Sequence, residues 1–160
     1  MNIIAIVQAR LGSTRLPNKV MKPIGDYSMI EILLKRLQKS KEINKIVVAT
    51  STDPANQKLV DHVKNLGFDC EIGSENDVLG RYLQTAEKYQ ADTIVRITGD
   101  CPLIDPSLTD EIIKKFKSQK IDYLSNTITP TYPDGLDTEV FTIASLKKAN
   151  NECNTLFDRE

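Results

Sequence analysis

The sequence of 160 residues contains a single histidine, His62, and no pair of cysteines separated by two residues. One histidine gives little support to a histidine-based metal site or to a catalytic triad. The three cysteines, Cys70, Cys101 and Cys153, are odd in number and widely spaced, which favours free thiols in a reducing compartment over a disulfide framework. We therefore expect a cytoplasmic protein.

Long hydrophobic runs and an excess of charge of one sign are also missing. The apolar run at residues 3–7 is far shorter than a membrane span, and no basic segment precedes it as in a signal peptide. The formal net charge is −1, which argues against general affinity for nucleic acid, so any anion site would be local. We expect neither a membrane nor a nucleic acid as a partner.

Short β-rich runs alternate with amphipathic stretches along the whole chain, without internal repeats or low-complexity segments. Strands are predicted at residues 3–7, 45–49, 70–72, 93–97, 122–124 and 139–141. Apolar residues repeat at helical spacing within residues 30–37, 59–66, 78–86 and 108–116. Asp105 and Pro106 are suited to be the N-cap and the first residue of the last helix. This alternation predicts one α/β domain whose mostly parallel sheet is covered by helices on both faces.

A turn rich in cations follows the first predicted strand, with Arg10, Arg15 and Lys19 placed around Gly12 and Ser13. Backbone N–H groups in such a turn form an anion-binding concavity, and fixed cations add charge-assisted hydrogen bonds. A solvated basic loop is the alternative, but open α/β sheets bind ligands at this position, which favours a nucleoside triphosphate. Neither the Walker A pattern nor GxGxxG occurs, which excludes both of those phosphate-binding turns.

Carboxylates follow later strands. Asp100 comes after the strand predicted at 93–97, beyond Thr98, and so lies at the same sheet edge as the cations. A carboxylate there suits Mg²⁺, which is commonly shared between one or two carboxylates and substrate phosphates, although a turn-capping aspartate is the alternative. Asp137 and Glu139 alternate along an extended segment, which predicts that both point to one face and contact the acceptor or the metal, unless that face is simply solvated.

Further polar residues belong to the same predicted edge. Ser51 closes the second strand, and Ser74, Asp77 and Arg81 follow the third. Asp77 is equally suited to be an N-terminal helix residue favoured by the helix dipole. Arg96 lies in an otherwise apolar strand end, where an unpaired charge would be costly, so we expect it to pair with a carboxylate or a ligand.

The segment QARLGSTRLPNK, at residues 8–19, resembles the nucleotide-binding signature of sugar-activating cytidylyltransferases. Within that group the sequence most resembles the SpsF type of spore coat polysaccharide biosynthesis, with CMP-Kdo and CMP-sialic acid synthetases as more distant relatives. The likeness continues through GSENDVLGRY, RITGDCPLID and YPDGLDTEVF, at residues 73–82, 96–105 and 132–141. It therefore covers nearly the whole chain in ordered blocks.

The resemblance implies a Rossmann-like three-layer nucleotidyltransferase fold and Mg²⁺-dependent transfer of CMP from CTP to a sugar acid or a phosphorylated small molecule. Pyrophosphate would be released, in the synthesis of surface-polysaccharide precursors. The implied catalytic residues are Arg10, Arg15, Lys19 and Asp100, with Asp100 as the metal ligand. The implied nucleotide-binding residues are Gln8, Ala9, Arg10, Gly12, Ser13, Arg15, Lys19, Ser51, Ser74, Asp77, Arg81 and Thr98. Asp137 and Glu139 would bind the acceptor.

Members of the resembled family run on for several tens of residues beyond this point, through segments that complete the acceptor pocket, the metal site and the dimer interface. We therefore expect residues 1–160 to form a single nucleotidyltransferase domain that is truncated at its C-terminus, and a homodimer where the later segment is present. Two alternatives stay open. One is a catalytically idle nucleotide-binding module, and the other is the same chemistry with UTP or GTP.

Overall fold

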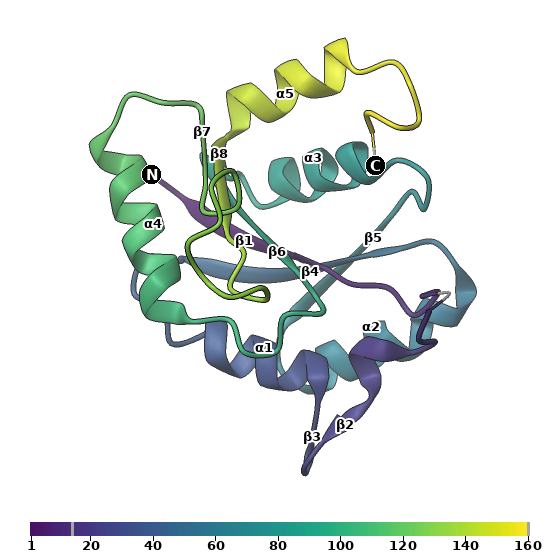
Figure 1. Cartoon of the computed structure of the whole chain (residues 1–160). Coiled ribbons are helices and arrows are strands. Elements are labelled where there is room, and N and C mark those ends of the chain that lie inside the picture. The colour runs from purple at the N-terminus through teal and green to yellow at the C-terminus, as the bar shows by residue number, and fades with distance from the viewer. Residues whose placement is uncertain (14, 160) are drawn as a thin grey trace.

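A computed structural model of the protein describes residues 1–13 and 15–159, and it places a six-stranded sheet between two layers of helices (Figure 1). The strands lie in the order β5-β4-β1-β6-β8-β7. Their bounds are β1 (Ile3–Gln8), β4 (Lys45–Ser51), β5 (Asp69–Gly73), β6 (Thr93–Thr98), β7 (Tyr123–Ser125) and β8 (Glu139–Thr142). The pairs that join β5, β4, β1 and β6 are parallel, whereas β8 runs antiparallel to both β6 and β7. The predicted mostly parallel sheet is confirmed.

Both faces of the sheet are covered because the strands are apolar on both sides. In β1, Ile3, Ala5 and Val7 pack in one core cluster, and Ile4 and Ile6 pack in the other. The helices are α1 (Met29–Leu37), α2 (Gln57–Asn65), α3 (Val78–Lys88), α4 (Pro106–Ser118) and α5 (Ile143–Glu152). Helices α1, α2 and α4 cover the first face, and α3 and α5 cover the second (Figure 1). The chain therefore has the three-layer arrangement expected of it.

The amphipathic patterns locate four of these helices, and Asp105 caps α4 as predicted, by accepting hydrogen bonds from the N–H groups of Ser107 and Leu108. Helix α5 was not predicted, because Leu146 is its single buried residue and its sequence shows no apolar stripe. The short hairpin formed by β2 (Pro23–Ile24) and β3 (Tyr27–Ser28) was not predicted either. Within the described residues, no helix has both the length and the apolar character required to cross a bilayer.

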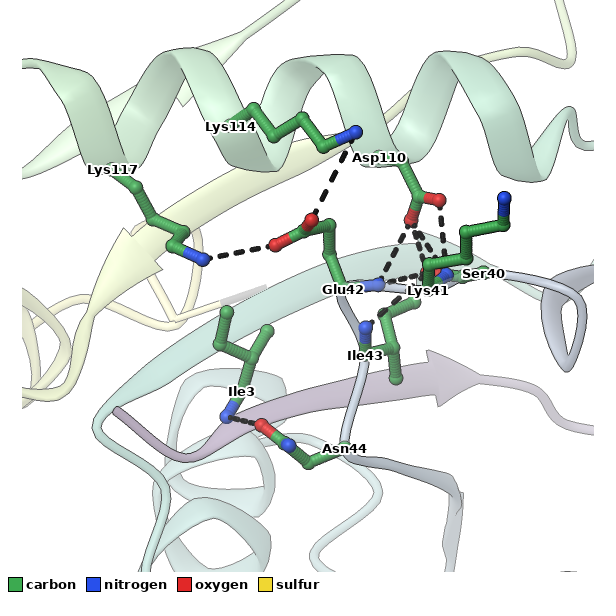
Figure 2. Close-up of polar contacts among 9 residues, drawn as sticks. All are labelled: Ile3, Ser40, Lys41, Glu42, Ile43, Asn44, Asp110, Lys114 and Lys117. Atoms are coloured by element: carbon green, nitrogen blue, oxygen red, sulfur yellow. Dashed lines mark hydrogen bonds and ion pairs between the residues drawn. The ribbon is translucent and has the colours of Figure 1, made fainter.

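The connection between α1 and β4 is held by a buried carboxylate of α4 (Figure 2). Asp110 accepts hydrogen bonds from the Ser40 hydroxyl and from the N–H groups of Lys41, at 2.9 Å, and Glu42, at 3.2 Å. At the end of the same connection, Asn44 Oδ1 accepts a 2.7 Å hydrogen bond from the N–H of Ile3. These contacts fix the edge where β1 and β4 begin. The loops at the opposite edge, where the parallel strands end, remain available for a site.

Candidate active site

The loops that follow β1 and β6 enclose a cavity of about 290 Å³ at the carboxyl edge of the sheet, which we call the cation cavity. Its lining includes eight of the residues predicted from the sequence: Gln8, Ala9, Arg10, Ser13, Arg15, Lys19, Thr98 and Asp100. Val20, Arg96 and Gly99 complete it. The structure therefore brings the predicted phosphate-binding loop and the predicted metal ligand together around one space.

The loop after β1 is anchored by a residue that we did not predict, Asn56. This side chain is 1% exposed, and its Oδ1 accepts a 2.8 Å hydrogen bond from the N–H of Leu11. Its Nδ2 donates to Ser51 Oγ, also at 2.8 Å. Ser51 is itself buried and does not line the cation cavity, so in this structure it supports the loop through Asn56. A single asparagine in the short 3₁₀ helix η2 (Pro54–Asn56) gives no sequence signal of this role.

The two loops touch at Gly99. Its N–H donates a 2.7 Å hydrogen bond to the carbonyl of Gln8. A Cβ at this position would lie 2.8 Å from both that carbonyl oxygen and Ala9 Cβ. Such a separation is below any normal contact with backbone atoms, so the close approach of the two loops requires glycine here.

Lys19 and Asp100 form an ion pair across the cation cavity, with 2.7 Å between Nζ and Oδ2. Partial burial raises the pKa of Asp100, but the hydrogen bond and charge of Lys19, together with the Thr98 hydroxyl, outweigh it. The net effect holds the pKa below its usual value of 3.8. Asp100 is therefore a carboxylate at neutral pH, and its side chain is 44% exposed and accessible to a ligand.

This lowered pKa predicts how stability depends on pH. Because the folded pKa lies below the unfolded value of 3.8, the ion pair contributes fully at neutral pH and is lost as the pH falls through the folded pKa. We expect Asp100→Asn to lower the free energy of unfolding by less than about 1 kcal/mol at pH 7, since the pair is exposed. The difference in free energy of unfolding between this variant and the wild type should shrink below pH 3.8. Urea unfolding of both proteins across a pH series measures this difference. A difference that does not change with pH would contradict the lowered pKa of Asp100.

Asp100 also lines a second cavity, of about 460 Å³, which contains Asp134 and Asp137 and which we call the acidic cavity. Burial raises the pKa of Asp137, and repulsion from Asp134, Glu139 and Asp100 adds to the effect. Carboxylates that repel one another around a shared space are stabilised by a bound cation. In the described part of the chain no three or more metal-ligating side chains form a ready-made cage. Mg²⁺ is, however, commonly held by one or two carboxylates together with phosphates, so this donor set fits it.

Asp137 and Glu139, which we expected to share one face, line different cavities, and their contact with an acceptor or a metal stays a prediction. Strand β8 begins at Glu139, and Asp137 lies in the preceding loop. Asp137 lines the acidic cavity, whereas Glu139 forms an ion pair with Arg96 and accepts a 2.8 Å hydrogen bond from the Tyr123 hydroxyl. The predicted carboxylate partner of Arg96 is thereby confirmed.

None of Ser74, Asp77 and Arg81 lines the cation cavity. Arg81 is 2% exposed, and its guanidinium donates a 2.7 Å hydrogen bond to the carbonyl of Ser74. Burial lowers the pKa of Arg81, and the nearby charge of Arg10 lowers it further. Asp77 caps α3 by accepting from the N–H of Gly80 at 2.7 Å and pairs with Arg159 at 2.9 Å. Contact of these residues with a nucleotide stays a prediction.

Comparison with known proteins places the chain among its relatives. Residues 4–160 match the profile of a family described as cytidylyltransferase. The whole chain is 42% identical to the uncharacterized protein MJ1063 of Methanocaldococcus jannaschii and covers 65% of its length. Over 126 residues, 76% of this chain, it is 39% identical to the spore coat polysaccharide biosynthesis protein SpsF of Bacillus subtilis and covers 52% of that protein. The chain thus spans about half to two thirds of the length of these curated relatives.

One solved structure supports the same grouping, and a second shares the fold. A structure described as a cytidylyltransferase from Leptospira borgpetersenii superposes with a TM-score of 0.96 at 38% identity, over 100% of this chain and 68% of that chain. A structure of CMP:2-keto-3-deoxy-manno-octonic acid synthetase complexed with CTP superposes with a TM-score of 0.79, over 97% of this chain and 80% of that chain. This chain and that synthetase are 17% identical in sequence, so the comparison shows a shared fold alone.

Proposed function

Because this chain belongs to the cytidylyltransferase family, we propose that it transfers CMP from CTP to a sugar acid or a phosphorylated small molecule and releases pyrophosphate. The observation that carries the proposal is the cation cavity, in which Arg10, Arg15 and Lys19 face Asp100 at the carboxyl edge of the sheet. The three free thiols are consistent with a cytoplasmic enzyme. The SpsF relative supports a place in the synthesis of surface-polysaccharide precursors.

Transfer of CMP requires that the two reactants be positioned and that negative charge on the leaving group be neutralised. An acceptor oxygen, either a phosphate oxygen or a sugar hydroxyl that gives up its proton to solvent, forms a bond to the α-phosphorus of CTP. The bond from that phosphorus to the oxygen bridging it to the β-phosphate breaks, and its electron pair leaves with pyrophosphate. Such transfers need little covalent help from the protein, because the barrier falls when charge on the leaving group is stabilised. We assign that task to the side chains of Arg10, Arg15 and Lys19, together with N–H groups of the loop that contains Gly12 and Ser13.

A divalent cation would be held by Asp100, with Asp137 as the second carboxylate. The ion would supply positive charge to the phosphate oxygens when bound. Asp100 has a further task of its own, because its ion pair orients the Lys19 ammonium group within the cation cavity.

We expect saturating CTP with Mg²⁺ to raise the melting temperature, since a ligand that binds only the folded state stabilises it by about 2.7 kcal/mol at 100 times its Kd. UTP and GTP should raise it less. Arg15→Ala should remove most of the shift, because losing one charge-assisted partner costs about 1.5–3 kcal/mol. Lys22→Ala is the matched control, since Lys22 is exposed and does not line the cation cavity. An unchanged melting temperature with CTP would refute the nucleotide assignment.

Turnover is tested by pyrophosphate release after sugar acids or sugar phosphates are added to the protein with CTP and Mg²⁺. Release that depends on an acceptor supports the enzyme. Binding of CTP without release for any acceptor would instead indicate a nucleotide-binding module. The homodimer stays a prediction, for which light scattering is the direct measurement.

A further inference from the structure

A third cavity, of about 380 Å³, lies between α3, α5 and β8, and we call it the β8 cavity. Its lining includes Tyr82, Tyr123, Glu139, Phe141 and Ser145. Arg96 lines both this cavity and the cation cavity, so the two spaces adjoin at its side chain. A molecule in the β8 cavity would therefore lie next to the bound nucleotide.

The cations that line the β8 cavity are already paired. Arg96 forms its ion pair with Glu139, and the Arg159 guanidinium lies 2.9 Å from Asp77 Oδ2. Asp158 adds a further negative charge to the lining. An anionic group placed deep in this cavity would consequently lose its hydration without gaining a free cation, which is unfavourable.

The remaining surface offers an apolar face and the polar side chains of Glu139 and Ser145. The rings of Tyr123 and Phe141 are stacked, with centroids 6.3 Å apart and planes inclined by 14°. Tyr82 is 3% exposed, and its hydroxyl has no hydrogen-bond partner among the residues that the structure describes. Burial raises the pKa of Tyr82 to about 12, so this hydroxyl keeps its proton at neutral pH. Glu139, whose carboxylate oxygens already accept from Arg96 and Tyr123, adds a hydrogen-bond acceptor to the same lining.

A ring with one apolar face and several hydroxyl groups matches this chemistry. We infer that the β8 cavity holds the uncharged, polyhydroxylated ring of the acceptor, with the reacting end directed past Arg96 to the nucleotide. An acceptor that carries a second anionic group at its far end is excluded, because that group would meet paired cations and Asp158. This inference rests on the proposed function and specifies which acceptors the same site takes.

The test measures binding to the protein by titration calorimetry, with Mg²⁺ and the non-hydrolysable analogue α,β-methylene-CTP present. The probes are two pairs that differ only at the far end. One pair is 3-deoxy-manno-octulosonate and its 8-phosphate, and the other is glucose 1-phosphate and glucose 1,6-bisphosphate. We expect at least one compound with an uncharged far end to bind, and its far-end phosphate counterpart to bind at least about tenfold more weakly.

A pair of variants tests the wall of the cavity. Tyr123→Ser removes one ring of the stacked pair. It should lower the affinity for the probe with an uncharged far end by about tenfold, while the affinity for the CTP analogue stays unchanged. Tyr132→Ser is the matched control, since Tyr132 is exposed to a similar degree, 47% against 44%, and lines a different cavity. It should leave both affinities unchanged.

The inference is overturned if none of the four probes binds, if a far-end phosphate binds as tightly as its counterpart, or if Tyr123→Ser and Tyr132→Ser behave alike. The comparison of probes uses the wild-type protein, so it does not depend on the folding of a variant. If the CTP analogue binds while one of these results appears, this inference alone fails. If the analogue does not bind, the proposed function fails with it.

Discussion

Asp100→Asn should lower the rate of pyrophosphate release from CTP by at least about 100-fold, while the protein stays folded. The change keeps the size of a side chain that is 44% exposed, so packing is unaffected. It removes the charged oxygen that a hard cation prefers and the partner that orients Lys19. Losing one such electrostatic contribution to the transition state typically costs about 10²–10³ in rate.

Steady-state rates over a range of Mg²⁺ concentrations measure this effect. Asp134→Asn is the control, because Asp134 contributes charge to the acidic cavity but does not line the cation cavity. It should change the rate much less than Asp100→Asn does. Wild-type rates for Asp100→Asn at limiting Mg²⁺ would remove Asp100 from the proposed metal site.

Gly99→Ala should destabilise the protein by about 1–3 kcal/mol and weaken CTP binding. The added Cβ would meet the carbonyl of Gln8 and the side chain of Ala9, each 2.8 Å away, so the loops after β1 and β6 must separate. That separation breaks the 2.7 Å hydrogen bond between Gly99 and Gln8 and widens the cation cavity. Urea unfolding and calorimetric titration with CTP measure the two effects.

Gly12→Ala supplies the matched control for stability. An added Cβ at Gly12 has no heavy atom within 4 Å, and its backbone does not adopt a positive φ. We expect its free energy of unfolding to be unchanged or slightly raised, because alanine reduces the entropy of the unfolded chain. Equal stability for both variants would show that the close approach at Gly99 is not a constraint.

Most of the correct predictions rest on where a residue stands in the sequence relative to a predicted strand. Apolar runs locate the strands, and the polar residues that directly follow β1 and β6 must meet, because parallel strands end at one edge. Arg10, Lys19 and Asp100 were therefore identified correctly as neighbours around one cavity. The cost of an unpaired charge in an apolar strand end predicted that Arg96 would pair with a carboxylate or a ligand, and the structure pairs it with Glu139.

Features that depend on contacts between distant segments could not be predicted from the sequence. The hydrogen bonds of Asn56 depend on where two loops happen to cross, and no local pattern reports this. Asp137 and Glu139 are two residues apart and were assigned one role. Asp137 lies in the loop before β8 and Glu139 begins that strand, and the two side chains line different cavities. The β8 cavity was missed because it needs α5, whose sequence has no apolar stripe.

The transfer of label from CTP carrying ³²P at its α-phosphorus tests the central claim most directly. The protein is incubated with this CTP, Mg²⁺ and a panel of sugar acids and sugar phosphates, and the products are separated and counted. Our account predicts that label enters an organic product other than CMP, with one pyrophosphate released for each label transferred. Label that remains in CTP, or that appears solely as CMP with every acceptor, would contradict it.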